Sequence, residues 1–186
     1  MPDIRERLEG QQKSEYFPIP FSIYASDIDF VVLGSKAEHK IGDIGVTWKA
    51  MYHPGKCFAY RVDYNGKSVV YATDAEYKKL GSAELKPAVE FFRDADLLIF
   101  DSMYTFSEGL EKEDWGHSST FIGVDLATEA NIKQIAFFHH EPTYSDFKLR
   151  DIFRQTEKYL KLVAPKQDLK MFLAYEGLKI DLLKDS

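Results

Sequence analysis

The sequence predicts an α/β fold in which helices cover one face of a sheet, and three observations carry this prediction. Residues 46–72 contain short runs of β-branched and aromatic residues, which are typical of strands. An Asn65-Gly66 pair separates two of these runs, and such a pair is a strong signal for a tight hairpin. After Asp74, helical and strand-like segments alternate, as they do in βαβ units.

The first part of the chain differs from the rest. Residues 3–12 have the apolar spacing of a short helix. The aromatic segment 16–21 contains two prolines, which exclude a helix there. We therefore expect a single domain in which residues 1–27 form an arm and a linker, and residues 28–186 form the sheet and its helices.

The elements of this larger part follow from the spacing of apolar residues. Alternation or a short unbroken apolar run predicts a strand, and a spacing of three or four predicts a helix. The expected strands are residues 29–33, 46–52, 58–64, 68–72, 97–100, 135–138, 170–174 and 178–182. The expected helices are residues 82–95, 118–130 and 146–163.

Length, charge and cysteine content limit the classes of function. The chain has 186 residues, of which 45% are hydrophobic, and this suits one domain with a sizeable core. Its 24 basic and 30 acidic residues leave a net charge of −6, so a nucleic-acid partner is disfavoured, though not excluded. One cysteine and the lack of any long apolar run predict a cytoplasmic protein without a disulfide or a membrane span.

Four polar residues stand near the ends of strand-like runs. His53, Asp74 and His139 each follow such a run, and His117 begins a helix after the loop that follows strand 97–100. Open α/β sheets bind ligands at the carboxyl ends of their strands, and imidazole and carboxylate suit Zn, Mn or Fe. Because a lone histidine or aspartate there is more often a surface or capping residue, the residue pattern alone leaves both interpretations open.

The local sequences around these residues are more specific. Six motifs occur in order: Tyr52-His53-Pro54-Gly55, Ala59-Tyr60-Arg61-Val62, Val70-Tyr71-Ala72-Thr73-Asp74, Asp96-Leu97-Leu98-Ile99-Phe100-Asp101, Trp115-Gly116-His117-Ser118-Ser119 and Ala136-Phe137-Phe138-His139-His140-Glu141-Pro142. Together they resemble the metallo-β-lactamase-fold hydrolases, and most closely the ribonuclease Z and phosphodiesterase-like branch. The resemblance implies that this chain supplies mainly the C-terminal half of an αββα sandwich.

Carried over residue by residue, the resemblance implies a phosphodiesterase-like hydrolase with two divalent ions, expected to be zinc with manganese or iron as alternatives. His53 would bind one ion, His139 the other, and Asp74 would bridge them. His117 is similar to the histidine that contacts the scissile phosphate or protonates the leaving group, which suits an imidazole near neutral pH. A hydroxide bridging the two ions would attack a small anionic or phosphodiester substrate.

Three further residues, His140, Glu141 and Asp101, are candidates to orient the ligating imidazoles, although a surface position is the more common place for each. The family's His-x-His-x-Asp-His motif does not occur in this sequence, and the remaining histidine, His39, is expected to be a solvated surface residue.

We therefore expect an N-terminally truncated domain with doubtful metal occupancy, because three protein ligands per catalytic zinc are usual. A half domain would leave a sheet face bare. It is thus expected to form a homo-oligomer, such as a dimer, or to bind a separately encoded N-terminal half. The alternative function is a non-catalytic, degenerate module for binding or assembly that keeps the fold without the metals.

Overall fold

The computed structural model describes residues 3–33, 38–78, 83 and 85–184. The chain divides into two compact units, Met1–His39 and Lys40–Ser186. In the first unit, helix α1 (Ile4–Gln11) confirms the helix expected there, and a single turn of 3-10 helix, η1 (Phe21–Ile23), follows. The strand expected at residues 29–33 is wrong, because that segment pairs with no strand among the described residues.

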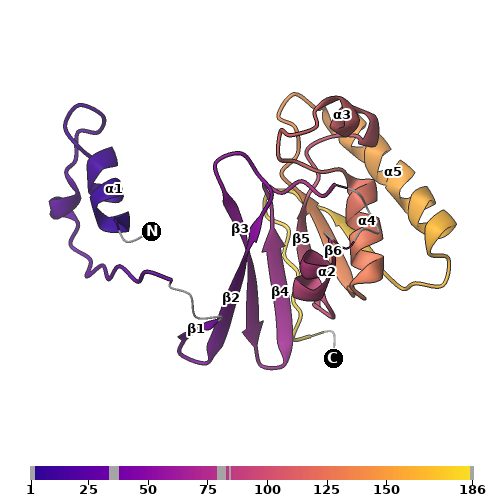
Figure 1. Ribbon diagram of the computed structural model, residues 1–186, viewed down its shortest axis with the longest axis horizontal. Coiled ribbons are helices and arrows are strands. Elements are labelled where there is room, and N and C mark those ends of the chain that lie inside the picture. Colours follow the sequence, from indigo (N-terminus) through magenta and orange to yellow (C-terminus); the bar gives the residue numbers. More distant parts are fainter. Residues whose placement is uncertain (1–2, 34–37, 79–82, 84, 185–186) are drawn as a thin grey trace. The chain divides into compact units, whose positions relative to one another are not determined.

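The larger unit is built on a mixed sheet whose seven strands follow one another in chain order (Figure 1). The strands are β1 (Glu38–Ile41), β2 (Ile44–Met51), β3 (Cys57–Tyr64), β4 (Lys67–Ala72), β5 (Leu97–Asp101), β6 (Gln134–Phe138) and β7 (Lys170–Leu173). Pairing is antiparallel from β2 to β4 and parallel from β4 to β7. The strands β2, β4, β5, β6 and β7 therefore run in one direction, and their carboxyl ends lie at one end of the sheet.

The predicted hairpin joins β3 to β4. Asn65 and Gly66 have φ angles of 48° and 70°, and positive φ at both central residues is what a type I′ turn requires. Tyr64 pairs with Lys67 across the turn. This register then decides which side chains of the two strands face the helices.

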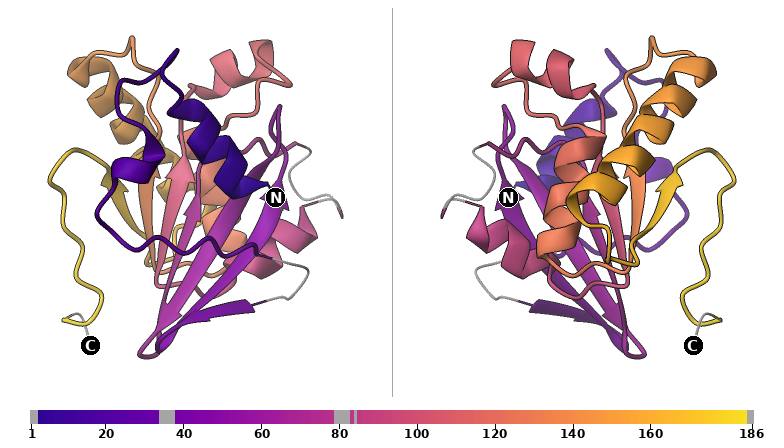
Figure 2. Two further views of the ribbon diagram at one scale, coloured as in Figure 1. Left: turned by 90° about the vertical axis from the view of Figure 1, so that its left-hand side faces the viewer. Right: turned by 90° about the vertical axis from the view of Figure 1, so that its right-hand side faces the viewer.

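Helices cover one face of this sheet (Figure 2, right). They are α2 (Lys86–Phe92), α4 (Thr120–Glu129) and α5 (Asp146–Val163), and α3 (Phe106–Glu111) packs on α4. Gly123 allows α4 to approach closely, because a Cβ atom there would lie 2.8 Å from the ring of Phe100 and 2.9 Å from that of Phe137. Among the described residues, none of these helices has the length and apolar character needed to cross a bilayer.

The opposite face of the sheet carries aromatic side chains that remain exposed. Ala59 and Val70 are fully buried on the helix side. Their neighbours Tyr60 and Tyr71, which pair across β3 and β4, point to the other side and are exposed. Phe58 on β3 shares this face and this exposure, since side chains alternate along a strand.

Two predicted elements need correction. Helix α2 ends at Phe92 rather than at the expected residue 95, because Arg93 leaves the helical region with a ψ of 130° and Asp94 follows with a left-handed φ of 55°. Residues 82 and 84, near the expected start of the helix, lie outside the described residues. Residues 178–182 form no strand, since a turn at Gly177 (φ 87°) takes the chain away from β7. The expected strand at residues 170–174 is confirmed as β7.

Candidate metal centre

Four strand ends position the candidate site. His53 follows β2, Asp74 follows β4, Asp101 ends β5 and His139 follows β6. His117 stands just before α4, in a loop that hydrogen bonds tie to the end of β5. These residues come from distant parts of the sequence, and the common direction of the strands brings them together.

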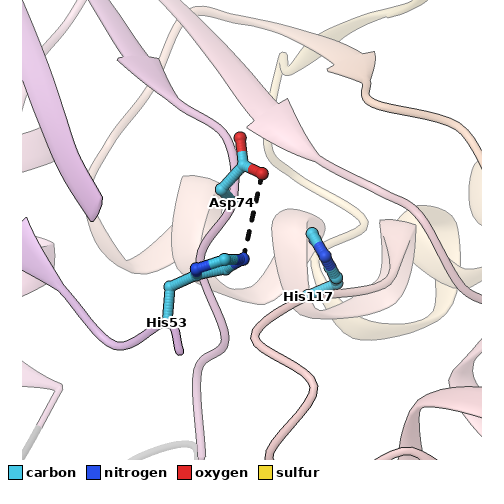
Figure 3. Close-up of side chains that lie close together, drawn as sticks. All are labelled: His53, Asp74 and His117. Carbon is cyan, nitrogen blue, oxygen red and sulfur yellow. Dashed lines mark ion pairs between the residues drawn. The ribbon is translucent and has the colours of Figure 1, made fainter. Parts of the chain in front are cut away.

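Asp74 lies at the centre of the group. Its Oδ1 atom is 3.4 Å from Nε2 of His139 and 3.9 Å from Nε2 of His53, and Figure 3 shows the latter pair with His117 beside it. The ring of His117 lies near both other imidazoles, with its centroid 5.2 Å from that of His53 and 5.0 Å from that of His139. The structure thus brings together all four residues that the sequence singled out.

Asp74 and His139 also share an uncommon backbone conformation. Their φ angles are 54° and 59°, in the left-handed region. Residues other than glycine adopt this region at a cost of order 1 kcal/mol or more, and such residues cluster at functional sites. In both cases the turn comes directly after a buried strand, and it directs the side chain toward the other members of the group.

The donor atoms fit a divalent ion. His53 Nδ1 lies 2.6 Å from the carbonyl oxygen of Pro54, which can only accept a hydrogen bond, so in the neutral imidazole Nδ1 carries the proton and Nε2 keeps its lone pair. Metal–nitrogen bonds of about 2.0–2.1 Å in a tetrahedral site place neighbouring ligand atoms about 3.3 Å apart. The separations of 3.4 Å and 3.9 Å from Asp74 Oδ1 are close to that spacing.

Asp101 is the residue that organises the site. It is fully buried, so the surface position considered for it is wrong. Its Oδ2 accepts hydrogen bonds from Asp74 N (2.8 Å) and His117 Nδ1 (2.9 Å), and its Oδ1 accepts from Ser118 N (3.0 Å) and Met103 N (3.2 Å). Two N–H donors satisfy each oxygen, so Asp101 is suited to hold the other residues in place rather than to bind an ion itself.

The hydrogen bond from Asp101 also affects His117 directly. It raises the pKa of the His117 imidazole above the ordinary value, although burial acts in the opposite direction. Because Nδ1 is engaged with the carboxylate, Nε2 is the nitrogen of His117 left to face a ligand.

The two other orienting candidates serve the surrounding structure. His140 is half-buried, its Nε2 donates to the carbonyl of Ala174 at 3.2 Å, and burial lowers the pKa of its imidazole. Glu141 is half-buried too, and it accepts hydrogen bonds from the amide and hydroxyl groups of Thr143 at 3.1 Å and 2.9 Å. His39 was expected to be a solvated surface residue. It lies in β1 and is half-buried, so that prediction is only partly confirmed.

Sequence reasoning missed two residues that shape the site. The carboxylate of Glu76 accepts from Gly116 N at 3.0 Å and from Asp114 N at 3.2 Å, which holds the His117 loop against the segment after β4. Gly116 has a φ of 88°, and a Cβ atom there would lie 2.5 Å from Cδ2 of His53. The only sequence signal for Gly116 was its place directly before His117, because its positive φ is visible only in the structure.

Comparison with known proteins agrees with this geometry. The family model for the beta-lactamase superfamily domain matches residues 7–140. A ribonuclease Z from Prochlorococcus marinus is 35% identical over 80 residues, covering 43% of this chain and 23% of that protein. A ribonuclease Z from Sulfurisphaera tokodaii is 33% identical over 109 residues, covering 52% of this chain and 36% of that protein. The chain thus matches only a quarter to about a third of the length of these relatives.

Solved structures share the fold. The metallo-beta-lactamase fold protein YhfI from Bacillus subtilis matches with a TM-score of 0.65 and 19% identity, over 95% of this chain and 61% of that chain. The short form of human tRNase Z matches with a TM-score of 0.53 and 16% identity, over 78% of this chain and 46% of that chain. With the family model matching well over half of its residues, the chain belongs to the beta-lactamase superfamily and has the metallo-β-lactamase type of α/β fold.

Proposed function

We propose that this chain supplies part of the metal site of a phosphodiester hydrolase. The observation that carries the proposal is the position of Asp74, whose Oδ1 atom lies within 4 Å of the Nε2 atoms of both His53 and His139. Membership of the superfamily and the likeness to ribonuclease Z proteins support it. Zinc is the expected metal, with manganese or iron as alternatives, because imidazole and carboxylate suit all three.

In this proposal each residue has one task. His53 and His139 each hold one ion, and Asp74 reaches both with its carboxylate. His117 holds a proton on Nε2 and gives it to the leaving group, while Asp101 fixes its Nδ1 and therefore the direction of the ring. A bound divalent ion would act as a Lewis acid that stabilises charge on the oxygens of the phosphodiester.

In this assignment the described residues offer each ion one imidazole and the shared carboxylate of Asp74, and His117 is kept as the proton donor although its ligand atom lies within 4.8 Å of those of His53 and Asp74. A catalytic zinc usually has three protein ligands, so the described residues supply too few for tight binding. No His-x-His-x-Asp-His motif occurs in the sequence to supply the rest. We infer that this polypeptide alone binds metal weakly, and that the remaining ligands come from another polypeptide segment.

Zinc titration of the metal-free protein against a chromophoric chelator tests this proposal. We expect binding that is weak and that falls at least tenfold in Asp74→Asn, His53→Ala and His139→Ala. His39→Ala is the matched control, because His39 lies in β1, outside the ligand cluster. Unchanged affinity in the three site variants would overturn the site. A tightly held, stoichiometric pair of ions in the unmodified chain would overturn the inference that the metal site is incomplete.

A partner is part of the same proposal. The exposed aromatic side chains on the face of the sheet opposite the helices, among them Phe58, Tyr60 and Tyr71, support association with a second copy or with a separate N-terminal half. Sedimentation equilibrium of the purified chain should give a dimer, and Tyr60→Lys should shift it toward monomer. A monomer at micromolar concentration would contradict self-association.

A cytoplasmic location belongs to this proposal as well, since a lone cysteine fits a reducing compartment.

The second candidate function is a non-catalytic binding or assembly module. The absence of the His-x-His-x-Asp-His motif from these 186 residues favours it. Hydrolysis of bis(4-nitrophenyl) phosphate distinguishes the two functions. A zinc-dependent rate that His117→Ala abolishes would support the hydrolase. Two results together would support the module. The unmodified chain would show no hydrolysis with metal in excess, and a variant with all four site residues replaced would still form the dimer.

A further inference from the structure

A pocket lies next to the candidate metal centre. It has a volume of about 320 Å³ and is lined by Glu76, Tyr77, Lys78, Phe106, Gly109, Leu110, Glu113, His117, Ser118, Ser119 and Ile122. This volume is at the lower end of the range for small-molecule sites. His117 lines this pocket and also lies in one group with His53 and Asp74 at the candidate metal centre, so a molecule bound at that centre has the pocket beside it.

The outer wall of the pocket is apolar and partly open to solvent. Phe106 and Leu110 of α3 are 46% and 67% exposed. The ring of Phe106 stacks on Phe121 of α4 with centroids 6.3 Å apart and planes 24° apart, which holds it in place. Ile122 adds an aliphatic surface from α4. Exposed apolar side chains gathered around a cavity are a common feature of ligand sites.

The polar part of the pocket is negatively charged. The Lys78 ammonium lies 2.6 Å from Asp114, 3.4 Å from Glu113 and 3.6 Å from Glu76. Among the described residues, three carboxylates thus surround one ammonium group, and this excess negative charge repels an anion that enters the pocket. Lys78 is already engaged, so it is poorly placed to bind a phosphate.

One buried polar group on this wall also has no partner. Tyr77 is 5% exposed, and its hydroxyl is buried without a hydrogen-bond partner among the described residues. Its ring stacks on Phe100 with centroids 5.3 Å apart. Buried hydroxyl groups are usually satisfied, so the hydroxyl of Tyr77 is an exception among the described residues.

We propose that this pocket binds a neutral or cationic aromatic group of the substrate, next to the bond that is hydrolysed. The apolar wall selects for a ring, and the surplus carboxylates select against a second phosphate group. The preferred substrate is thus a small ester with an aromatic substituent rather than a polynucleotide, whose neighbouring groups are all anionic. This inference rests on the proposed function, because His117 links the pocket to the candidate metal centre.

Protein NMR on the metal-free chain in the presence of EDTA tests the pocket separately from any hydrolysis. The probes are benzyl alcohol, benzylammonium and isophthalate, which share one aromatic ring and differ in charge. We expect benzyl alcohol and benzylammonium to shift the amide signals of Leu110, His117 and Ile122, and isophthalate to bind at least fivefold more weakly than benzylammonium. Equal affinity for the cation and the dianion would overturn the proposal.

A matched pair of variants tests the apolar wall. Phe106→Ala removes a ring from the start of α3, and Phe147→Ala removes a ring that is 83% exposed near the start of α5 and does not line the pocket. Benzyl alcohol affinity should fall at least threefold in the first variant and stay unchanged in the second. Unchanged affinity in Phe106→Ala would contradict the pocket. Probe binding without any metal-dependent hydrolysis would leave the pocket supported and count against the proposed function alone.

Discussion

Replacing Gly116 by alanine separates the packing of the site from ordinary backbone strain. Gly116 has a φ of 88°, and an added Cβ would lie 2.5 Å from Cδ2 of His53 and 2.6 Å from Cδ of Pro54. Gly177 has nearly the same φ, 87°, with no atom within 4 Å of an added Cβ. The two Gly→Ala variants therefore share a backbone cost and differ in the clash with His53.

The size of each effect follows from these contacts. A Cβ in the left-handed region costs about 1–2 kcal/mol, and this is the whole effect expected for Gly177→Ala. Overpacking adds about 1–3 kcal/mol, so Gly116→Ala should lower the free energy of unfolding by about 2–5 kcal/mol. Because the added atom meets the imidazole of His53 itself, the weak zinc affinity should also fall, by at least tenfold.

Urea denaturation gives both free energies, and chelator competition gives both zinc affinities. The expected result is a larger loss of stability in Gly116→Ala than in Gly177→Ala, and a loss of zinc affinity in Gly116→Ala alone. Equal losses of stability in the two variants, or unchanged zinc affinity in a folded Gly116→Ala protein, would refute the packing of Gly116 on His53.

Three further changes test the surrounding structure by urea denaturation. Asp101→Asn should cost about 2–4 kcal/mol, because either amide orientation sets an NH₂ group against two N–H donors; a loss below 1 kcal/mol would count against the network. Burial alone would raise the pKa of Glu108, but hydrogen bonds from Thr105, Tyr144 and Lys148 outweigh it and lower the pKa from 4.5 to about 2. The contribution of the ionised Glu108 to the free energy of unfolding is therefore complete above about pH 4.5 and is lost as the pH falls through 2. Glu108→Gln should therefore cost about 1 kcal/mol at pH 7, after allowance for solvent screening, and much less at pH 2, whereas a pH-independent difference would contradict this. Tyr77→Phe removes an unpartnered buried hydroxyl and should raise stability by up to about 1 kcal/mol; a loss above 1 kcal/mol would show that the hydroxyl is satisfied.

Much of the fold could be predicted because its elements have strong local patterns. The longest helix was expected at residues 146–163 and is observed as Asp146–Val163. The hairpin followed from Asn65-Gly66 alone. Helix α3 was missed because six residues that include Gly109 have no clear apolar spacing. Its signal was the capping box of Thr105 and Glu108, in which each side chain bonds the other's backbone.

The candidate site could be predicted only in part. The position of His53, Asp74 and His139 after strand-like runs was visible in the sequence, and the parallel strands explain why they meet. The role of Asp101 was not visible, because an aspartate that ends an apolar run has the same local pattern whether it is exposed or buried. Its donors, Asp74 and His117, lie 27 and 16 residues away, and only the folded sheet brings them within reach.

The measurement that tests the central claim most directly is zinc titration followed by NMR of protein labelled with ¹⁵N in its histidines. If His53 and His139 each bind a zinc ion beside Asp74, the Nε2 signals of both histidines shift as zinc is added, and the signals of His39 do not change. In Asp74→Asn, both shifts should move to at least tenfold higher zinc concentration. A lack of shift at either histidine, or shifts unaffected by Asp74→Asn, would contradict metal binding beside Asp74 at the ends of these strands.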